Sequence, residues 1–338
     1  MASAWPEAPI YTALYDEEAV GDLIPRERVR TSFLASIPGA NANFRYFAPL
    51  YPRAFEAFDL SKFDVIISST SAWAKGVRFR TDAVHVCFIH TVSRFLFDYD
   101  RYVGTLLPEV ASPIARVMVD RLVKWDLRAA TAPTRFVANS QTVADRVRKY
   151  YHRDSEVLHS PADIDRFTIG RGGGDYFFIA SRLLPYKRID LAIDAAQQAG
   201  VKLVVAGGGP AENALRARAG GTTTTMLGFV SDALINELLG NARAAILAGE
   251  EDLGLVPIEA AAAGRPTIAY RGGGARETVV EGETGAFFDE QTPESLAAVL
   301  RTFNPGAYDP IRLREHAQMF SPQKFIERLR AIVEATRG

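Results

Sequence analysis

The sequence predicts an α/β protein built on parallel sheets, and three observations lead to that prediction. Short apolar runs alternate with helical segments along the second half of the chain, as in β–α–β units. Glycines and charged residues gather where the predicted strands end, at the edge where parallel sheets bind ligands. The length of 338 residues is enough for two domains of ordinary size.

The first half has the less regular pattern. Strands are predicted at residues 64–69, 83–89, 135–138 and 156–159. A long helix is expected over residues 113–130, because an apolar stripe recurs there at helical spacing. The stripe, interpreted as core, consists of Ile114, Val117, Met118, Leu122 and Trp125. Cys87 and His85 lie inside an apolar strand and are interpreted as structural residues.

The second half alternates regularly from Asp175 onward. Strands are predicted at residues 176–180, 201–206, 222–227, 244–247 and 267–270, and helices at 190–199, 210–219, 231–239 and near Pro257. Ser231 is a predicted N-cap, and Gly264 is a predicted C-cap. The run Arg171-Gly172-Gly173-Gly174 has the composition of a flexible linker. We therefore expect domains over residues 1–170 and 171–320.

Composition narrows the function classes. The chain is 48% hydrophobic and 23% charged with a net charge of −1, which argues against nucleic acid as the main partner. No apolar stretch approaches the ~20 residues that a membrane-spanning helix needs. The N-terminus lacks the basic and apolar regions of a signal peptide. A cytoplasmic location is expected.

The most informative pattern is a pair of glutamates, Glu251 and Glu259, with seven residues between them. The chain is predicted to bend at Gly254 and to become helical near Pro257. The free amides of Leu255 and Val256 would then form an anion site between two carboxylates. Such a site suits a nucleotide with hydroxyl-rich groups on both sides. Two solvated surface glutamates remain the alternative.

Three further patterns bear on chemistry. Gly207-Gly208-Gly209 follows a strand and permits close backbone approach to a ligand, but it does not fit the G-x-G-x-x-G of dehydrogenases. Asp98-Tyr99-Asp100 and Asp163-Ile164-Asp165 have the Asp-x-Asp form of some metal-binding sites, but neither follows a strand in the right setting. We expect no metal cofactor.

Several motifs, in this order and spacing, resemble those of the retaining glycosyltransferases of family 4 (glycosyl transferases group 1). Besides the two glutamates, they are Phe136-Val137-Ala138-Asn139-Ser140, Ser181-Arg182-Leu183-Leu184-Pro185-Tyr186-Lys187-Arg188, Gly207-Gly208-Gly209-Pro210, Leu227-Gly228-Phe229-Val230-Ser231-Asp232 and Gly272-Gly273-Gly274-Ala275-Arg276-Glu277. The resemblance implies the GT-B fold, in which two Rossmann-like domains face each other across a cleft. It also implies that a final helix, residues 321–338, crosses back to the first domain. The family's opening strand and glycine-rich loop have no counterpart at the start of this sequence.

The resemblance assigns roles to individual residues. Arg182 and Lys187 match the pair that binds the donor diphosphate, and a solvated basic turn is the alternative for them. Glu251 would hold hydroxyls of the transferred sugar, Glu259 those of the ribose, and the amides of Leu255 and Val256 a phosphate. The backbone of Gly228, Phe229 and Val230 would lie near the base. His90 would approach the transferred sugar, although a histidine that closes a strand is more often structural.

Two of the motifs, Ile89-His90-Thr91 and Pro185-Tyr186-Lys187-Arg188, look most like those of bacterial GDP-mannose-dependent mannosyltransferases of surface-polysaccharide assembly. The resemblance therefore implies transfer of a hexose, mannose from GDP-mannose, to a lipid-linked saccharide. A UDP-sugar donor and a catalytically silent nucleotide-sugar-binding protein remain alternatives. Arginines and aromatic residues alternate over residues 26–53, as in a segment that contacts an anionic membrane from the cytoplasmic side. A solvated loop is the alternative there.

Overall fold

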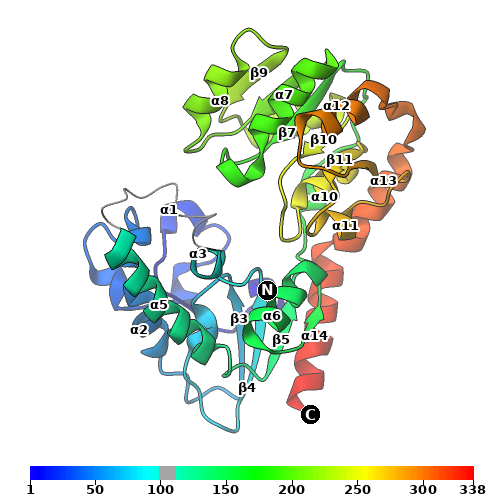
Figure 1. The fold of residues 1–338 in the computed structure, drawn as a ribbon. Coiled ribbons are helices and arrows are strands. Elements are labelled where there is room, and N and C mark those ends of the chain that lie inside the picture. Colours follow the sequence, from blue (N-terminus) through cyan, green and yellow to red (C-terminus); the bar gives the residue numbers. More distant parts are fainter. Residues whose placement is uncertain (99–111) are drawn as a thin grey trace. The chain divides into compact units, whose positions relative to one another are not determined.

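The computed structural model describes residues 1–98 and 112–338, and its chain divides into two compact units (Figure 1). The first unit comprises Met1–Asn139, Val143–Leu158 and Ile326–Gly338, and the second comprises Ser140–Thr142 and His159–Phe325. Each unit contains a parallel sheet flanked by helices. The predicted α/β class with two parallel-sheet domains is confirmed.

The first unit is built on a four-stranded parallel sheet in the order β3-β4-β5-β6. The strands are β3 (Val65–Thr70), β4 (Val84–Ile89), β5 (Arg135–Ala138) and β6 (Ser155–Val157), close to the four predicted positions. Two earlier strands, β1 (Ile10–Thr12) and β2 (Val29–Thr31), pair in a separate parallel sheet. Outside the undescribed residues 99–111, the α-helices of this part of the chain are α1 (Glu17–Val20), α2 (Tyr51–Glu56), α3 (Arg94–Phe97), α5 (Ser112–Ala129) and α6 (Gln141–Tyr151).

Only part of the apolar stripe on α5 belongs to the core. Leu122 and Trp125 are buried, whereas Val117 and Met118 are 55% and 42% exposed. The side chain of Ile114 lies outside the described residues. The core interpretation is therefore wrong for Val117 and Met118, because the buried residues of the helix lie in its C-terminal half, as Leu122, Trp125 and Ala129 show.

The interpretation of His85 and Cys87 as structural residues of β4 is confirmed. Both side chains are fully buried. Burial lowers the pKa of His85 to about 3, so its ring is neutral, and Nε2 lies 2.7 Å from the Ser68 hydroxyl. Burial raises the pKa of the Cys87 thiol to about 11, which makes it a poor nucleophile.

The last helix, α14 (Pro322–Arg337), contributes its residues from Ile326 onward to the first unit. Arg330 donates to the carbonyl of Ala4 at 2.6 Å, and Arg328 forms an ion pair with Glu156 at 2.7 Å. The two ends of the chain therefore meet within one unit.

The second unit contains a six-stranded parallel sheet in the order β12-β11-β10-β7-β8-β9. Its strands are β7 (Tyr176–Ala180), β8 (Lys202–Ala206), β9 (Thr224–Gly228), β10 (Ala245–Leu247), β11 (Thr267–Tyr270) and β12 (Gly285–Phe288). Its helices are α7 (Ile189–Ala199), α8 (Glu212–Ala219), α9 (Asp232–Asn241), α10 (Leu255–Ala262), α11 (Ala275–Thr278), α12 (Pro293–Thr302) and α13 (Pro310–Ala317). The predicted N-cap is confirmed, since the Ser231 hydroxyl accepts from the Leu234 amide, whereas the C-cap of α10 is Ala263 and Gly264 follows it with φ of 71°.

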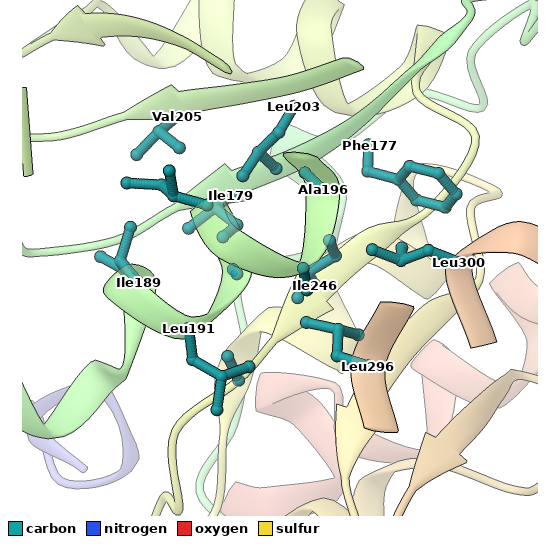
Figure 2. Close-up of a cluster of buried hydrophobic side chains, with 14 of the residues drawn as sticks. Phe177, Ile179, Ile189, Leu191, Ala196, Leu203, Val205, Ile246, Leu296 and Leu300 are labelled. Atoms are coloured by element: carbon teal, nitrogen blue, oxygen red, sulfur yellow. The ribbon is translucent and has the colours of Figure 1, made fainter. Parts of the chain in front are cut away.

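Helices cover both faces of this sheet because successive strand residues point to opposite sides. Phe177 and Ile179 of β7 face α7 and α12, where they join one buried cluster with Leu191 and Leu296 (Figure 2). Phe178, between them, faces a second cluster that includes residues of α10 and α13. The carboxyl edge of the sheet is thus held between two packed layers.

The glycine run at 172–174 is not the flexible linker that its composition predicts. The Gly172 amide donates to the Gly240 carbonyl at 3.2 Å, and the Gly174 amide to the Asn241 carbonyl at 3.0 Å. A Cβ on Gly174 would lie 2.4 Å from the Asn241 carbonyl oxygen. Glycine is needed here because two backbone segments of the second unit approach closely.

A buried ion pair links the elements of the first unit. The ammonium of Lys75, with a side chain only 1% exposed, bonds the fully buried Asp126 at 2.5 Å. Asp126 also accepts from the Ser93 hydroxyl at 3.1 Å and from the Tyr151 hydroxyl at 2.6 Å. The carboxylate therefore joins η5 (Ala74–Gly76), α5 and α6, and each buried charge has a partner.

Replacement of Lys75 by methionine should lower the free energy of unfolding of the first unit by about 3–5 kcal/mol, because Asp126 would remain buried without its counter-ion. Tryptophan fluorescence in a urea titration reports on this unit alone, since Trp5, Trp73 and Trp125 all belong to it. Arg148→Met is the control, because Arg148 and its partner Asp154 are 71% and 88% exposed and the change should cost less than about 1 kcal/mol. Equal losses in the two variants would contradict the account.

Candidate functional site

The candidate site lies at the carboxyl edge of the second sheet, where the chain changes direction. From β7 the sheet grows through β8 to β9, and the chain then returns to add β10 on the other side of β7. At such a point the loops that follow neighbouring strands diverge, which leaves a crevice in which ligands of open parallel sheets bind. The loops that follow β7 and β10 are those that carry Lys187 and Glu251.

Lys187 and Glu251 form an ion pair at this edge. Lys187 ends η8 (Pro185–Lys187), just after β7, and its ammonium donates to Oε1 of Glu251 in the loop after β10. The two side chains are 20% and 15% exposed. The structure therefore brings together two residues that the sequence assigned to one site, and each partly buried charge is compensated.

The Lys187 loop can reach Glu251 because Gly249 has no side chain. A Cβ on Gly249 would lie 2.6 Å from the Tyr186 carbonyl oxygen and 2.8 Å from the Cα of Lys187. The next residue, Arg188, adopts a left-handed conformation with φ of 54°, which is unusual for a residue other than glycine. Sequence analysis missed Gly249, although a glycine two residues after a predicted strand was a usable signal.

Helix α10 presents an uncapped N-terminus next to Glu251. Its N-cap is Gly254, with φ of 82° and no side-chain cap. In the part of the chain that the structure describes, the amides of Leu255 and Val256 have no hydrogen-bond acceptor. The helix begins at Leu255 rather than near Pro257, so these amides belong to its first turn. The positive end of the helix is therefore open to an anion.

Glu259 lies on the same helix and has its own cation. Oε1 of Glu259 is 3.2 Å from Arg166, which also approaches Asp232 at 3.5 Å. Burial raises the pKa of Glu259, and the Arg166 charge opposes that rise. Sequence analysis missed Arg166, because nothing in its local pattern points to a partner so distant in the sequence.

Arg182 follows β7 directly and is exposed. Among the described residues, no hydrogen bond or ion pair of its guanidinium is found. The glycines after β8 hold its loop: the Leu183 amide donates to the Gly208 carbonyl at 3.0 Å, and a Cβ on Gly207 would lie 1.9 Å from the Ser181 carbonyl oxygen. Gly207 is therefore required by packing between two loops, a reason that differs from the approach to a ligand proposed from the sequence.

The segment Gly228-Phe229-Val230 follows β9 at the same edge. The Gly228 carbonyl accepts from the Gly207 amide at 2.7 Å, so the loops after β8 and β9 are joined. Phe229 is 91% exposed, while Val230 packs on the core of the unit. A large apolar ring left in water at a ligand-binding edge is available for stacking.

The loop after β11 fixes the Glu251 loop from the other side. The Gly274 amide donates to the Glu251 carbonyl at 2.9 Å. Glu277, in the next turn, accepts from His159 at 3.0 Å and from the Gln141 amide at 2.8 Å. Burial works against the charge of Glu277, but these hydrogen bonds outweigh it and leave its pKa lowered.

His90 belongs to the first unit, where it follows the carboxyl end of β4. Its Nε2 lies 2.8 Å from the Ser69 hydroxyl, and its ring meets the Phe88 ring edge-on at 5.0 Å. Burial lowers the pKa of His90, so the imidazole is neutral near pH 7. The hydroxyl of Ser140, in the second unit, donates to the Asp252 carbonyl at 2.5 Å.

The structure describes all of one Asp-x-Asp tripeptide and only the first residue of the other. Asp165, within η7 (Ile164–Arg166), pairs with Arg314 at 3.4 Å. Residues 99 and 100 of the other tripeptide lie outside the described residues. Over residues 1–98 and 112–338, no group of three acidic, histidine or cysteine side chains is arranged to hold a metal ion.

The arginines of the basic–aromatic segment differ in their surroundings. Arg28 donates to the carbonyls of Ala2, Trp5 and Ala8, so it holds the N-terminal segment in place. Arg45 and Arg53 are exposed. Within the described residues, no helix has the length and the apolar character needed to cross a bilayer.

Family comparisons cover most of the chain in two parts. Residues 10–166 match the model "Glycosyltransferase Family 4", and residues 162–317 match "Glycosyl transferases group 1". A glycogen synthase of Pseudomonas paraeruginosa is 36% identical over 149 residues, which are 41% of this chain and 29% of the relative. A GDP-mannose-dependent alpha-(1-6)-phosphatidylinositol dimannoside mannosyltransferase of Mycobacterium tuberculosis is 33% identical over 152 residues, 42% of this chain and 39% of the relative. These alignments thus span about a third of each relative's length.

Comparison with solved structures concerns the fold. HepE from Anabaena, solved in complex with UDP and glucose, superimposes with a TM-score of 0.65 and 18% sequence identity. The match covers 90% of this chain and 85% of HepE. The superposition shows the GT-B fold, and the two family models show that the chain belongs to the family 4 glycosyltransferases.

Proposed function

We propose that this protein is a retaining glycosyltransferase that moves a hexose from a nucleotide sugar to a saccharide acceptor. The Lys187–Glu251 ion pair carries the proposal, because it lies beside the open N-terminus of α10 at the switch point of the sheet. A cation, free backbone amides and a carboxylate in one place fit a substrate that joins a diphosphate to a sugar.

In this proposal, Lys187, Arg182 and the tip of α10 stabilise the leaving diphosphate. Negative charge grows on the diphosphate as the glycosidic bond breaks, and donors aimed at that charge lower the barrier. The lysine ammonium has three N–H donors, so Lys187 can bond Glu251 and a phosphate oxygen together. Among the residues that the structure describes, the Arg182 guanidinium has no partner that it would have to release first. Because these groups supply the positive charge, the proposed reaction needs no metal cofactor. A measurement of turnover in the presence of EDTA tests this expectation.

The remaining roles concern the two ends of the donor. Glu251 accepts hydrogen bonds from hydroxyls of the transferred sugar, and Glu259 from those of the ribose. The base lies near Gly228, Phe229 and Val230. Neutral His90 hydrogen-bonds a hydroxyl of the transferred sugar. The acceptor oxygen attacks the anomeric carbon from the face that the diphosphate leaves, and the departing phosphate takes the acceptor proton.

We propose GDP-mannose as the donor and a lipid-linked saccharide of polysaccharide biosynthesis as the acceptor. The name of the mycobacterial relative, which includes GDP-mannose, supports GDP-mannose as the donor. Exposed Arg45, Arg53 and Tyr46, the last 84% exposed, support a peripheral contact with anionic lipid at the inner face of the membrane. Cosedimentation with anionic liposomes tests that contact, and an absence of binding would remove it.

Lys187→Ala and Glu251→Gln should each lower kcat for sugar transfer by about 100-fold or more, because each removes a group aimed at the reacting end of the donor. Product analysis by NMR gives both the rate and the retained anomeric configuration. The matched control is Lys202→Ala, since Lys202 pairs with Asp175 at the opposite, amino edge of the same sheet. Equal rates in all variants would contradict the assigned roles, and no turnover of the wild type with any donor would indicate a silent binding protein.

A thermal-shift panel separates the donors. GDP-mannose should raise the unfolding temperature more than UDP-glucose does at the same concentration, because stabilisation follows RT ln(1 + [L]/Kd). A larger shift with the UDP-sugar would overturn the GDP-mannose assignment. HepE, whose structure holds UDP and glucose, makes UDP-glucose the appropriate competitor.

Gly249→Ala should reduce turnover by at least about tenfold, because its methyl group would push Lys187 away from Glu251. Gly306→Ala is the control: its Cβ would meet no atom nearer than Oδ1 of Asn304, at 3.3 Å. Steady-state kinetics with a fixed acceptor measure both variants. Full activity of Gly249→Ala would show that the loop is free to move and that the close approach is unimportant.

A further inference from the structure

The first unit contains a cavity of about 340 Å³ that the donor assignments leave unused. It lies where the loop after β1 meets the 3-10 helix η4 (Phe44–Leu50), α2 and the turn before η5. The volume is at the lower end of the range of small-molecule sites, about 300–1,000 Å³. Six of its lining residues carry a polar side-chain atom: Thr12, Tyr15, Asp16, Asn41, Tyr51 and Trp73.

One wall of the cavity is a fixed aromatic surface. The rings of Tyr51 and Trp73 stack with centroids 5.9 Å apart and an interplanar angle of 9°. Trp73 also packs against Phe95 at 5.5 Å and Trp125 at 5.7 Å. Trp125 is anchored in turn by a 2.6 Å hydrogen bond to Glu56. The wall is therefore held by its neighbours before any ligand arrives.

The same wall carries two polar groups whose hydrogen-bonding capacity is unused in the described residues. In the described residues, neither the Tyr51 hydroxyl nor the Trp73 indole N–H makes a hydrogen bond. Burial raises the pKa of Tyr51, so the phenol remains a neutral donor at physiological pH. Each of these rings thus offers both an apolar face and a hydrogen-bonding edge.

Acceptors and donors of another kind come from the loops opposite. Asp16 caps α1 with Oδ1, which accepts from the Ala19 amide at 3.3 Å, and its second oxygen has no hydrogen bond within residues 1–98 and 112–338. Asn41 donates to the Tyr15 carbonyl at 3.0 Å, which orients its side-chain carbonyl. A fixed carboxylate oxygen and a fixed amide oxygen suit hydroxyl donors.

We propose that this cavity binds one pyranose ring of the acceptor saccharide. A pyranose has an apolar C–H face that fits the Trp73–Tyr51 surface and a rim of hydroxyls that fits Asp16 and Asn41. Asp16 and Asn41 are exposed, and an alkyl chain in the cavity would displace water from their side-chain oxygens without replacing its hydrogen bonds, at a cost in free energy. An anion would be repelled by Asp16. This inference rests on the proposed function, because it gives the acceptor of that transfer a place in the first unit.

Tryptophan fluorescence of the full chain tests the proposal without any donor. Methyl glycosides of mannose, glucose, galactose and N-acetylglucosamine are the probes, and at least one should change the emission in a saturable way. Asp16→Asn keeps an N-cap for α1 but loses the charged acceptor, and Trp73→Phe keeps a ring but loses the N–H. Each should weaken binding about tenfold or more. Asp309→Asn, which changes the N-cap of α13 in the second unit, should leave binding unchanged.

The possible outcomes separate this inference from the proposed function. Saccharide binding that depends on Asp16 and Trp73 supports the cavity even if no nucleotide sugar is turned over. If the protein turns over a nucleotide sugar but binds no glycoside, or if all variants bind glycosides equally, the proposed saccharide site is wrong. The proposed transferase function is then unaffected. Binding of decanol that is insensitive to Asp16→Asn, with no response to the glycosides, would identify an alkyl site and likewise overturn it.

Discussion

The candidate site depends on one electrostatic contact, the ion pair between Lys187 and Glu251. Both side chains are largely removed from water, so each charge needs the other, and loss of either would leave a poorly solvated charge behind. The sheet order makes the contact possible, because β7 and β10 are neighbours in space although the two residues are 64 positions apart. The ion pair thereby ties the loop that carries Arg182 to the loop that leads into α10, and the groups that we propose to bind the diphosphate are held as one set.

Close contacts between backbones surround this ion pair. Gly249 lets the Lys187 loop approach β10, Gly207 lets the Arg182 loop approach β8, and the Gly274 amide holds the Glu251 carbonyl. A side chain at either of the first two positions would separate loops whose charged groups must act together. The edge is therefore rigid in its backbone, while Arg182 and Phe229 remain exposed at its surface. Rigid positioning of a few free polar groups is what a site needs to stabilise charge that develops during a reaction.

Sequence patterns predicted much of the second unit, because its strands and helices alternate with clear periods and its motif residues follow strand ends. They also placed Lys187 and Glu251 in one site. Patterns could not find Arg166, whose partner Glu259 lies 93 positions away, since such pairing depends on the sheet order. The glycine run at 172–174 was misjudged because composition cannot distinguish a flexible linker from a tightly packed backbone. Val117 and Met118 were misjudged because a helical stripe predicts an apolar face but not how much of that face is covered.

The two units use buried polar groups differently. In the first, Lys75 and Asp126 join several elements and have no contact with solvent, which fits a structural role. In the second, the ion pair keeps some exposure and lies at the edge that we propose to bind the donor. The most direct test of this account is a crystal structure of the protein with GDP. The account predicts that the diphosphate lies within hydrogen-bond distance of the Lys187 ammonium and of the Leu255 or Val256 amide. A diphosphate bound away from these groups, with the Lys187–Glu251 pair untouched, would contradict it.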